Sequence, residues 1–340
     1  MRCLAILANT LLEALLLASA SATAGEPQLQ LPLACKPGTD CWIANHVDLD
    51  PGPLAQDYRC GHLTYNGHDG TDFAIRDMAA MREGMAVLAA AAGAIRAVRD
   101  GVPDRNVRQA GEDSVKKIEC GNGVVIAHED GWETQYCHLR EGSILVKPGQ
   151  RVTAGEALGK VGLSGLTEFP HLHFIVRKAG KPVDPFLGPE ETPRCGATPH
   201  PLWKDSPAVS LPYAPGVIYH AGIAPEEPTT QAIREGRYGR PNGTPIAIDR
   251  NAGALVFYVE VFGLSEKDRL SLRLTAPDGS TLASREVSME RSQARWIGFV
   301  GKHRRADMWP AGSYRAEAIL IHANSTAAEP SRRTIDFDVR

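Results

Sequence analysis

Apolar and polar residues alternate in short runs between residues 60 and 188, a pattern that predicts β-strands. Glu129-Asp130-Gly131 separates two of these runs and is a hairpin signal. The stretch from Met85 to Arg99 is rich in alanine and favours a helix by propensity alone. Its residues alternate beyond Gly93, however, and we therefore predict a strand there. The predicted strand segments are residues 85–99, 123–128, 132–138, 146–152, 155–162 and 173–177.

A second series of short runs follows residue 246. The segment 254–261 is a clear strand, residues 270–274 alternate, and Pro277-Asp278-Gly279 forms a turn between runs. This spacing predicts a C-terminal β-sandwich of immunoglobulin-like type, with its last strand at 335–339. Residues 189–245 hold eleven of the chain's twenty-four prolines, which indicates a Pro-rich linker or an extended wrapping segment.

The N-terminus has the pattern of a secretory signal peptide. Arg2 precedes an apolar run, Leu11 to Leu17, and small residues end at Ala22-Thr23-Ala24. No later stretch is apolar for long enough to span a bilayer, so we expect no transmembrane anchor. The formal charge of −3 gives no indication of nucleic-acid binding. We therefore divide the 340 residues as follows: signal peptide 1–24, N-terminal extension 25–59, central domain 60–188, linker 189–245 and sandwich 246–340.

Cysteine usage agrees with export. Six cysteines remain after the signal peptide, an even number without a C-x-x-C pair, which suggests disulfides rather than a zinc knuckle. Short separation favours Cys35–Cys41, and the predicted hairpin brings Cys137 opposite the region just after Cys120. Cys60–Cys195 would then connect the two ends of the central domain.

Three short segments supply four histidines and a carboxylate. His171-Leu172-His173 places two imidazoles on one face of a strand, because residues i and i+2 point the same way. His68 and Asp72 add a nitrogen and an oxygen across a turn containing Gly70. Tyr136-Cys137-His138-Leu139 supplies the remaining histidine. This inventory is that of a catalytic zinc site with acid/base partners.

The order H-x-G-x-D, Y-x-H-L and H-x-H resembles the lysostaphin/LytM family of zinc endopeptidases over about residues 60–188. The resemblance implies a mainly-β fold, with an open antiparallel sheet whose groove binds peptidoglycan peptides. It also implies one Zn²⁺ per chain, held by His68, Asp72 and His173, with water at the fourth position. His138 and His171 would then be the catalytic groups beside that water.

For the other histidines and tyrosines near these motifs we expect structural rather than catalytic roles. We expect His128 to support the site or the fold, His62 to be a surface or loop residue, and Tyr65 and Tyr136 to pack in the groove.

We expect an exported hydrolase of the peptide part of peptidoglycan, located in the periplasm or cell envelope. Disulfides in a cell-wall enzyme favour a Gram-negative periplasm, and hence D-alanyl–diaminopimelyl cross-links as the bond that is cut. Two alternatives stay open: a non-hydrolytic regulator or wall-binding scaffold acting on a partner hydrolase, and a D-Ala carboxypeptidase. The sandwich has three possible roles, which are binding the wall, binding an envelope protein, and covering the groove.

Overall fold

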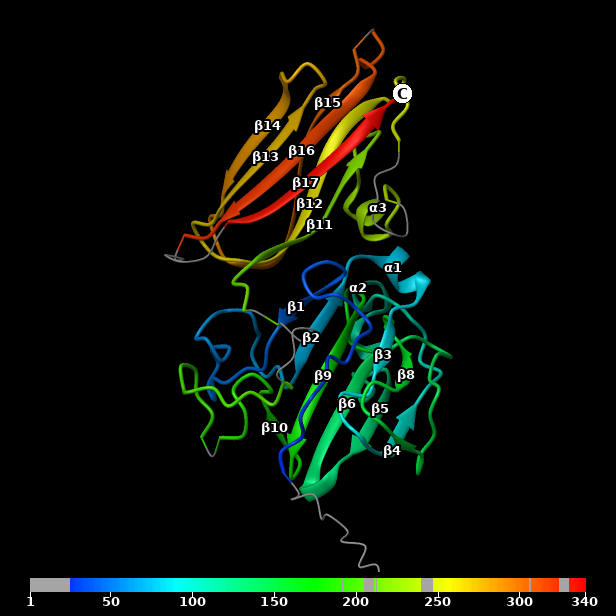
Figure 1. Ribbon diagram of the computed structural model, residues 1–340, viewed down its shortest axis with the longest axis vertical. Helices are drawn as coiled ribbons and strands as arrows, with labels where there is room; N and C mark the ends of the chain where they lie inside the picture. The colour runs from blue at the N-terminus through cyan, green and yellow to red at the C-terminus, as the bar shows by residue number, and fades with distance from the viewer. Residues whose placement is uncertain are drawn as a thin grey trace, which may run out of the picture.

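The computed structural model is mainly β and contains several antiparallel sheets (Figure 1). It describes residues 25–190, 192–204, 211, 213–239, 247–305, 307–323 and 330–340. The predicted signal peptide, residues 1–24, lies outside the described residues. Within the described part of the chain, no helix is both long enough and apolar enough to cross a membrane.

The N-terminal half of the chain forms an open antiparallel sheet of eight strands in the order β1-β2-β9-β6-β5-β4-β7, with β10 paired to β9. A separate two-stranded ribbon joins β3 to β8. The strands of the large sheet are β1 Cys41–Asn45, β2 Thr71–Ile75, β4 Gly93–Arg99, β5 Asn122–Ala127, β6 Trp132–Leu139, β7 Arg151–Val152, β9 His171–Lys178 and β10 Lys181–Val183. The remaining elements of this half are β3 Ala86–Leu88, β8 Ala157–Lys160, the helices α1 Met78–Glu83 and α2 Val107–Ala110, and the 3-10 turns η1 Glu112–Val115 and η2 Glu129–Gly131.

Alternation along the central strands separates the core from the opposite face of the sheet. Leu172 and Phe174 of β9 are fully buried and pack with Val124 and Tyr136 in one hydrophobic cluster. The histidines at positions 171 and 173 therefore point to the other face. The packing of the core thus decides which face carries the chemistry.

Most of the predicted strands are confirmed. The hairpin around Glu129-Asp130-Gly131 consists of β5 and β6, and the alanine-rich segment forms β3 and β4 rather than a helix. The strand predicted at 146–152 is wrong for most of its length, because only Arg151–Val152 pairs. Gly149 has a φ of 84°, and Gln150 bonds back to Lys147, so a turn occupies the first part of that segment.

The C-terminal strands form two sheets that share one hydrophobic core, which makes this unit a β-sandwich. One sheet has the order β11-β12-β15 and the other β14-β13-β16-β17. The immunoglobulin-like assignment stays a prediction. The elements are β11 Val217–Ala224, α3 Thr230–Arg234, β12 Ala254–Leu264, β13 Arg269–Thr275, β14 Thr281–Ser288, β15 Gln293–His303, β16 Gly312–Ile321 and β17 Ser331–Val339.

Two of the predicted segments contribute strands to these sheets. The N-terminal extension, residues 25–59, contributes β1 to the large sheet and buries Leu29 and Leu33 in its core. The Pro-rich linker, residues 189–245, contains β11 and α3, and β11 pairs with β12 along most of its length. Proline content misled the linker prediction, since Val217–Ala224 is itself free of proline and mostly buried.

Among the described residues, three disulfides join Cys35 to Cys41, Cys60 to Cys195, and Cys120 to Cys137. Short separation and the predicted hairpin favoured the first and the third of these pairings, and the second is the pair that then remained.

The sandwich lies against the end of the large sheet near β1, β2 and α1 (Figure 1). Trp42, Ala44 and Ala74 from the sheet form one buried cluster with Tyr219 and Phe262 from the sandwich. An ion pair between Arg82 of α1 and Glu235 after α3 lies at the rim of this contact.

Candidate metal centre

Pairing of β2 with β9 brings the predicted ligands together. Asp72 stands opposite His173 in the register, and Ala74 stands opposite His171. His173 is also opposite Cys137 of β6, so His138 follows directly at the same level of the sheet. His68 precedes β2 and reaches the same place across the turn at Gly70.

Three potential ligand atoms converge between these strands. Oδ1 of Asp72 lies 2.8 Å from Nδ1 of His173 and 3.2 Å from Nε2 of His68. The two nitrogens are 3.1 Å apart. His68 and Asp72 are buried, and the His173 side chain is only 12% exposed, so little solvent separates the three groups.

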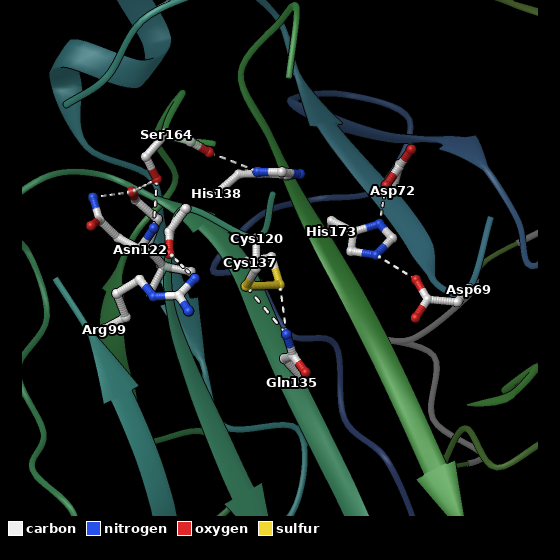
Figure 2. The surroundings of a disulfide bond; sticks show 12 residues. Asp69, Asp72, Arg99, Cys120, Asn122, Gln135, Cys137, His138, Ser164 and His173 are labelled. Carbon is white, nitrogen blue, oxygen red and sulfur yellow. Dashed lines mark hydrogen bonds and ion pairs between the residues drawn. A yellow bond between two sulfur atoms is a disulfide. The ribbon is translucent and has the colours of Figure 1, made fainter. Parts of the chain in front are cut away.

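Hydrogen bonds outside the cluster fix which ring atoms face inward. Nδ1 of His68 donates to the backbone oxygen of His46 over 2.6 Å, so its Nε2 has a free lone pair when the ring is neutral. Nε2 of His173 lies 3.1 Å from Oδ1 of Asp69, which leaves Nδ1 to face the cluster (Figure 2). Asn45 donates to the other oxygen of Asp72 over 2.8 Å and thereby orients the carboxylate.

The electrostatics of the cluster favour a cation. Burial alone would raise the pKa of Asp72, but the neighbouring imidazoles of His68 and His171 hold it well below its usual value. Burial lowers the pKa of His173, yet hydrogen bonds with Asp69 and Asp72 outweigh it and raise that pKa to about 9. Asp72 is thus held as a carboxylate, the form in which it can bind a cation.

The donor set fits zinc. Two imidazole nitrogens and one carboxylate oxygen are three of the four ligands of a catalytic zinc site, which keeps one position open. A second group of ligand types, Cys35, Asp40 and Cys41, does not fit, because its two sulfurs form a disulfide.

Two further histidines adjoin the cluster. The rings of His138 and His171 have centroids 4.8 Å apart, and Nε2 of His171 lies 3.4 Å from Oδ1 of Asp72. His138 donates from Nδ1 to the backbone oxygen of Ser164 over 2.7 Å (Figure 2), and His171 donates from Nδ1 to the oxygen of Phe169 over 2.9 Å. Both rings therefore present Nε2 as a proton acceptor.

The backbone conformation and the burial of His138 hold its imidazole in place and keep it neutral. Its φ is 62°, in the left-handed region, and its N–H bonds to the oxygen of Cys120, so the disulfide partner of Cys137 anchors the turn. Burial lowers the pKa of the imidazole well below its usual value, and the nearby rings of His171 and His173 lower it further. The ring is neutral at pH 7.

Residues 66–185, which include all five groups, match Peptidase family M23. The chain carries an M23 peptidase domain.

Curated relatives share part of this domain. Cell division protein DipM of Caulobacter vibrioides is 48% identical over 73 residues, which are 20% of this chain and 12% of that protein. Peptidoglycan DD-endopeptidase ShyA of Vibrio cholerae is 44% identical over 64 residues, 19% of this chain and 14% of that protein. DD-carboxypeptidase/endopeptidase Mpg of Neisseria meningitidis is 38% identical over 91 residues, 27% of this chain and 19% of that protein. The chain therefore spans less than a fifth of these relatives.

Two solved structures match part of the chain. The catalytic domain of lysostaphin from Staphylococcus simulans is 26% identical and covers 41% of this chain and 85% of its own, with a TM-score of 0.26. A zinc containing peptidase from Vibrio cholerae is 28% identical and covers 41% of this chain and 38% of its own, with a TM-score of 0.27.

The other residues singled out from the sequence lie around the M23 site in different roles. Tyr136 is fully buried and its hydroxyl accepts from the N–H of Ala90, so it belongs to the core. Tyr65 is 55% exposed, with its ring 4.5 Å from that of His68. His128 bonds to Ala92 and Thr134 at the far end of β5, where it supports the fold. His62 lies in a loop, as expected, and its Nε2 is 3.3 Å from the backbone oxygen of Gly263 in the sandwich.

Sequence reasoning missed the group behind His173. Asp69 lies between Nε2 of His173 and the guanidinium of Arg177, at 3.1 Å from each. Arg177 in turn donates to Gln135 over 2.6 Å, and Gln135 contacts the sulfurs of the Cys120–Cys137 disulfide (Figure 2). The position of Asp69 directly after His68 was the one sequence signal for this role, since metal-binding histidines commonly have a carboxylate hydrogen-bonded to their second ring nitrogen.

Proposed function

We propose that the chain is an exported zinc-dependent endopeptidase that hydrolyses amide bonds in the peptide part of bacterial peptidoglycan. The observation that carries this proposal is the convergence of three ligand atoms from His68, Asp72 and His173 on one face of the sheet. Family membership supports hydrolysis of a peptide bond, and a relative named as a peptidoglycan DD-endopeptidase supports the substrate class.

In this proposal His68 and His173 would hold the metal through Nε2 and Nδ1, and Asp72 would hold it through Oδ1. A zinc ion bound there would polarise the scissile carbonyl and lower the pKa of a bound water from about 15.7 to roughly 7. Asp69 keeps the proton of His173 on Nε2, and the backbone oxygen of His46 keeps that of His68 on Nδ1. Both rings then hold a lone pair toward the metal position.

His138 and His171 handle protons in this mechanism. Since Nδ1 of each ring donates to a backbone oxygen, each Nε2 is free to accept a proton from the attacking water. The protonated imidazole then donates that proton to the leaving amine. While charged, it also stabilises the negative charge that develops on the carbonyl oxygen. The lowered pKa of His138 keeps that ring neutral before reaction, the form that can accept a proton.

Export and cross-link specificity are further parts of the proposal. Three disulfides favour an oxidising compartment such as the periplasm or cell envelope. In a Gram-negative wall the bond cut is then the D-alanyl–diaminopimelyl cross-link. The predicted signal peptide is consistent with this location.

The test uses the purified mature chain with bound zinc and isolated cross-linked muropeptide dimers. Release of monomers that is abolished by a chelator and restored by zinc supports the proposal. His173→Ala is expected to lose both zinc and cleavage, whereas His138→Ala keeps zinc and loses cleavage. His303→Ala is the matched control, because that imidazole is 74% exposed in the sandwich. Intact dimers after incubation of the zinc-loaded wild type would refute the enzyme proposal.

One relative's name favours a second candidate, a D-Ala carboxypeptidase. The same assay with an uncross-linked pentapeptide distinguishes the two activities. Release of free D-Ala from the pentapeptide, with dimers left intact, would replace the endopeptidase proposal. Stoichiometric zinc with neither product would favour the regulator or scaffold instead.

A further inference from the structure

Phe169 holds His171 in two ways. Its backbone oxygen accepts from Nδ1 of His171 over 2.9 Å, and its ring stacks on the imidazole with centroids 4.6 Å apart and planes at 29°. Thr167 adds a hydroxyl that lies 2.9 Å from the same backbone oxygen and 3.2 Å from Nδ1. The position of Phe169 therefore sets both the tautomer and the plane of the His171 ring.

The support of Phe169 comes from the C-terminal sandwich. Its ring centroid lies 5.4 Å from that of Phe262 in β12, and the guanidinium of Arg295 in β15 lies 5.1 Å from it. Phe169 is only partly buried, and its ring packs against the buried cluster that joins the sheet to the sandwich. Residues more than ninety positions apart in the sequence thus meet behind the proton-transfer histidine.

Arg295 is itself rigidly held. Its Nε donates to the hydroxyl of Tyr219 over 2.8 Å, and its Nη2 donates to Oε1 of Glu260 over 3.0 Å. Glu260 is fully buried and also accepts from Nδ1 of His220 over 3.0 Å. A buried carboxylate with several charged donors fixes the guanidinium plane more firmly than a surface pair would.

We propose that the C-terminal sandwich positions His171 for proton transfer through Phe169, with Arg295 as the positioning residue on the sandwich side. This inference rests on the proposed function, since it assigns the sandwich a part in the same reaction. Neither Phe169 nor Arg295 belongs to the group of ligand residues. Their effect is on the orientation of the imidazole alone.

This arrangement predicts a specific kinetic effect. Loss of the stacking partner leaves His68, Asp72 and His173 unchanged, so zinc content stays at one ion per chain. It lets the His171 ring rotate away from its reactive orientation. A displacement of about 1 Å in a reacting group lowers turnover by up to about 10²-fold, while substrate binding is unaffected. The loss therefore appears in kcat and not in KM.

The experiment compares Phe169→Leu and Arg295→Lys with the zinc-loaded wild type. We expect kcat to fall on the order of tenfold for Phe169→Leu. For Arg295→Lys we expect a fall of about fivefold, because lysine keeps the charge but loses the planar contact. Phe169→Tyr retains the aromatic ring, and we expect its kcat to be close to that of the wild type. The matched controls are Phe299→Leu, a partly exposed phenylalanine of β15, and Arg332→Lys, an arginine in a surface ion pair.

A second measurement does not depend on turnover. Histidine-selective ¹⁵N NMR of the zinc-loaded protein reports the tautomer and mobility of the His171 ring. We expect wild type to give a single Nε2-acceptor signature, and Phe169→Leu and Arg295→Lys to give mixed tautomers or broadened signals. An unchanged His171 signal in both variants would overturn the inference, even if the wild type hydrolyses no substrate. Equal losses in the Phe299→Leu control, or a loss of zinc, would overturn it as well.

Discussion

Asp69 gives the sharpest test of how the metal centre is built. Its Oδ1 lies 3.1 Å from Nε2 of His173, and its Oδ2 lies 3.1 Å from Nη2 of Arg177. Asp69→Asn keeps the size of the side chain but removes the charge. The amide has one acceptor oxygen for two donors, so it can serve His173 or Arg177 but not both. The amide nitrogen of the variant must then face a donor. Because the carboxylate no longer accepts the proton of Nε2, the basicity of His173 at Nδ1 falls.

The magnitude follows from the exposure of the carboxylate. Losing an outer partner of a metal-binding histidine typically lowers metal affinity about 10–100-fold. The Asp69 side chain is 41% exposed, so water replaces part of the lost interaction, and the effect belongs at the low end of that range. We therefore expect zinc to bind about tenfold more weakly, which corresponds to about 1.4 kcal/mol.

Competition with a chromophoric zinc chelator at pH 7.5 measures this affinity directly. The control is Asp113→Asn on the exposed turn η1, which removes the same charge away from the site. At saturating zinc, Asp69→Asn should hydrolyse substrate at most of the wild-type rate, because the three proposed metal ligands are unchanged. Equal zinc affinities for Asp69→Asn and Asp113→Asn would refute the assignment of Asp69 as the partner of His173.

Three other perturbations test the fold around the site. Gly70→Ala should weaken zinc binding, measured by the same competition, because a Cβ there would lie 2.7 Å from Cε1 of His173; full affinity would contradict the predicted contact. Replacing both cysteines of the Cys120–Cys137 disulfide by serine should lower the free energy of unfolding by about 3 kcal/mol in denaturant titrations, since the cysteines are 17 residues apart. Burial raises the pKa of Glu260, but the hydrogen bond from His220 and the charge of Arg295 lower it to about 2 from the model-peptide value of 4.5. The ionised Glu260 therefore contributes on the order of 3 kcal/mol to the free energy of unfolding above pH 4.5, and this contribution is lost as the pH falls toward 2. The melting temperature of the wild type should therefore fall more steeply in that window than that of Glu260→Gln, and parallel curves would disprove this.

The ligand types and their spacing were predictable because they depend on short-range geometry. The i, i+2 alternation of a strand places His171 and His173 on one face whatever the rest of the chain does. Likewise, the hairpin at residues 129–131 fixes where Cys137 lies relative to Cys120. Neither inference needs to know which strands pair across the sheet.

The supporting residues depend on longer-range pairing and were therefore missed. Asp69 acquires its partner only when β2 pairs with β9, more than ninety residues later. In the same way, β1 and β11 lie in stretches with many turn residues, and only their partners β2 and β12 identify them as strands. Local composition carries no signal for such pairings.

The contact between sandwich and sheet has a consequence for the chemistry of the site. A general base must be neutral before it accepts a proton, and in a cluster of four imidazoles the local packing decides which ring stays neutral. His138 is buried under the turn at Ser164, and burial is the largest influence lowering its pKa. The orientation of His171 depends instead on Phe169, and through it on Arg295 in the sandwich. The environments of His138 and His171 are thus determined by different parts of the molecule. A catalytic fragment limited to the M23 match would retain the support of His138 and Phe169 itself, but it would lose Phe262 and Arg295, which pack on the ring of Phe169.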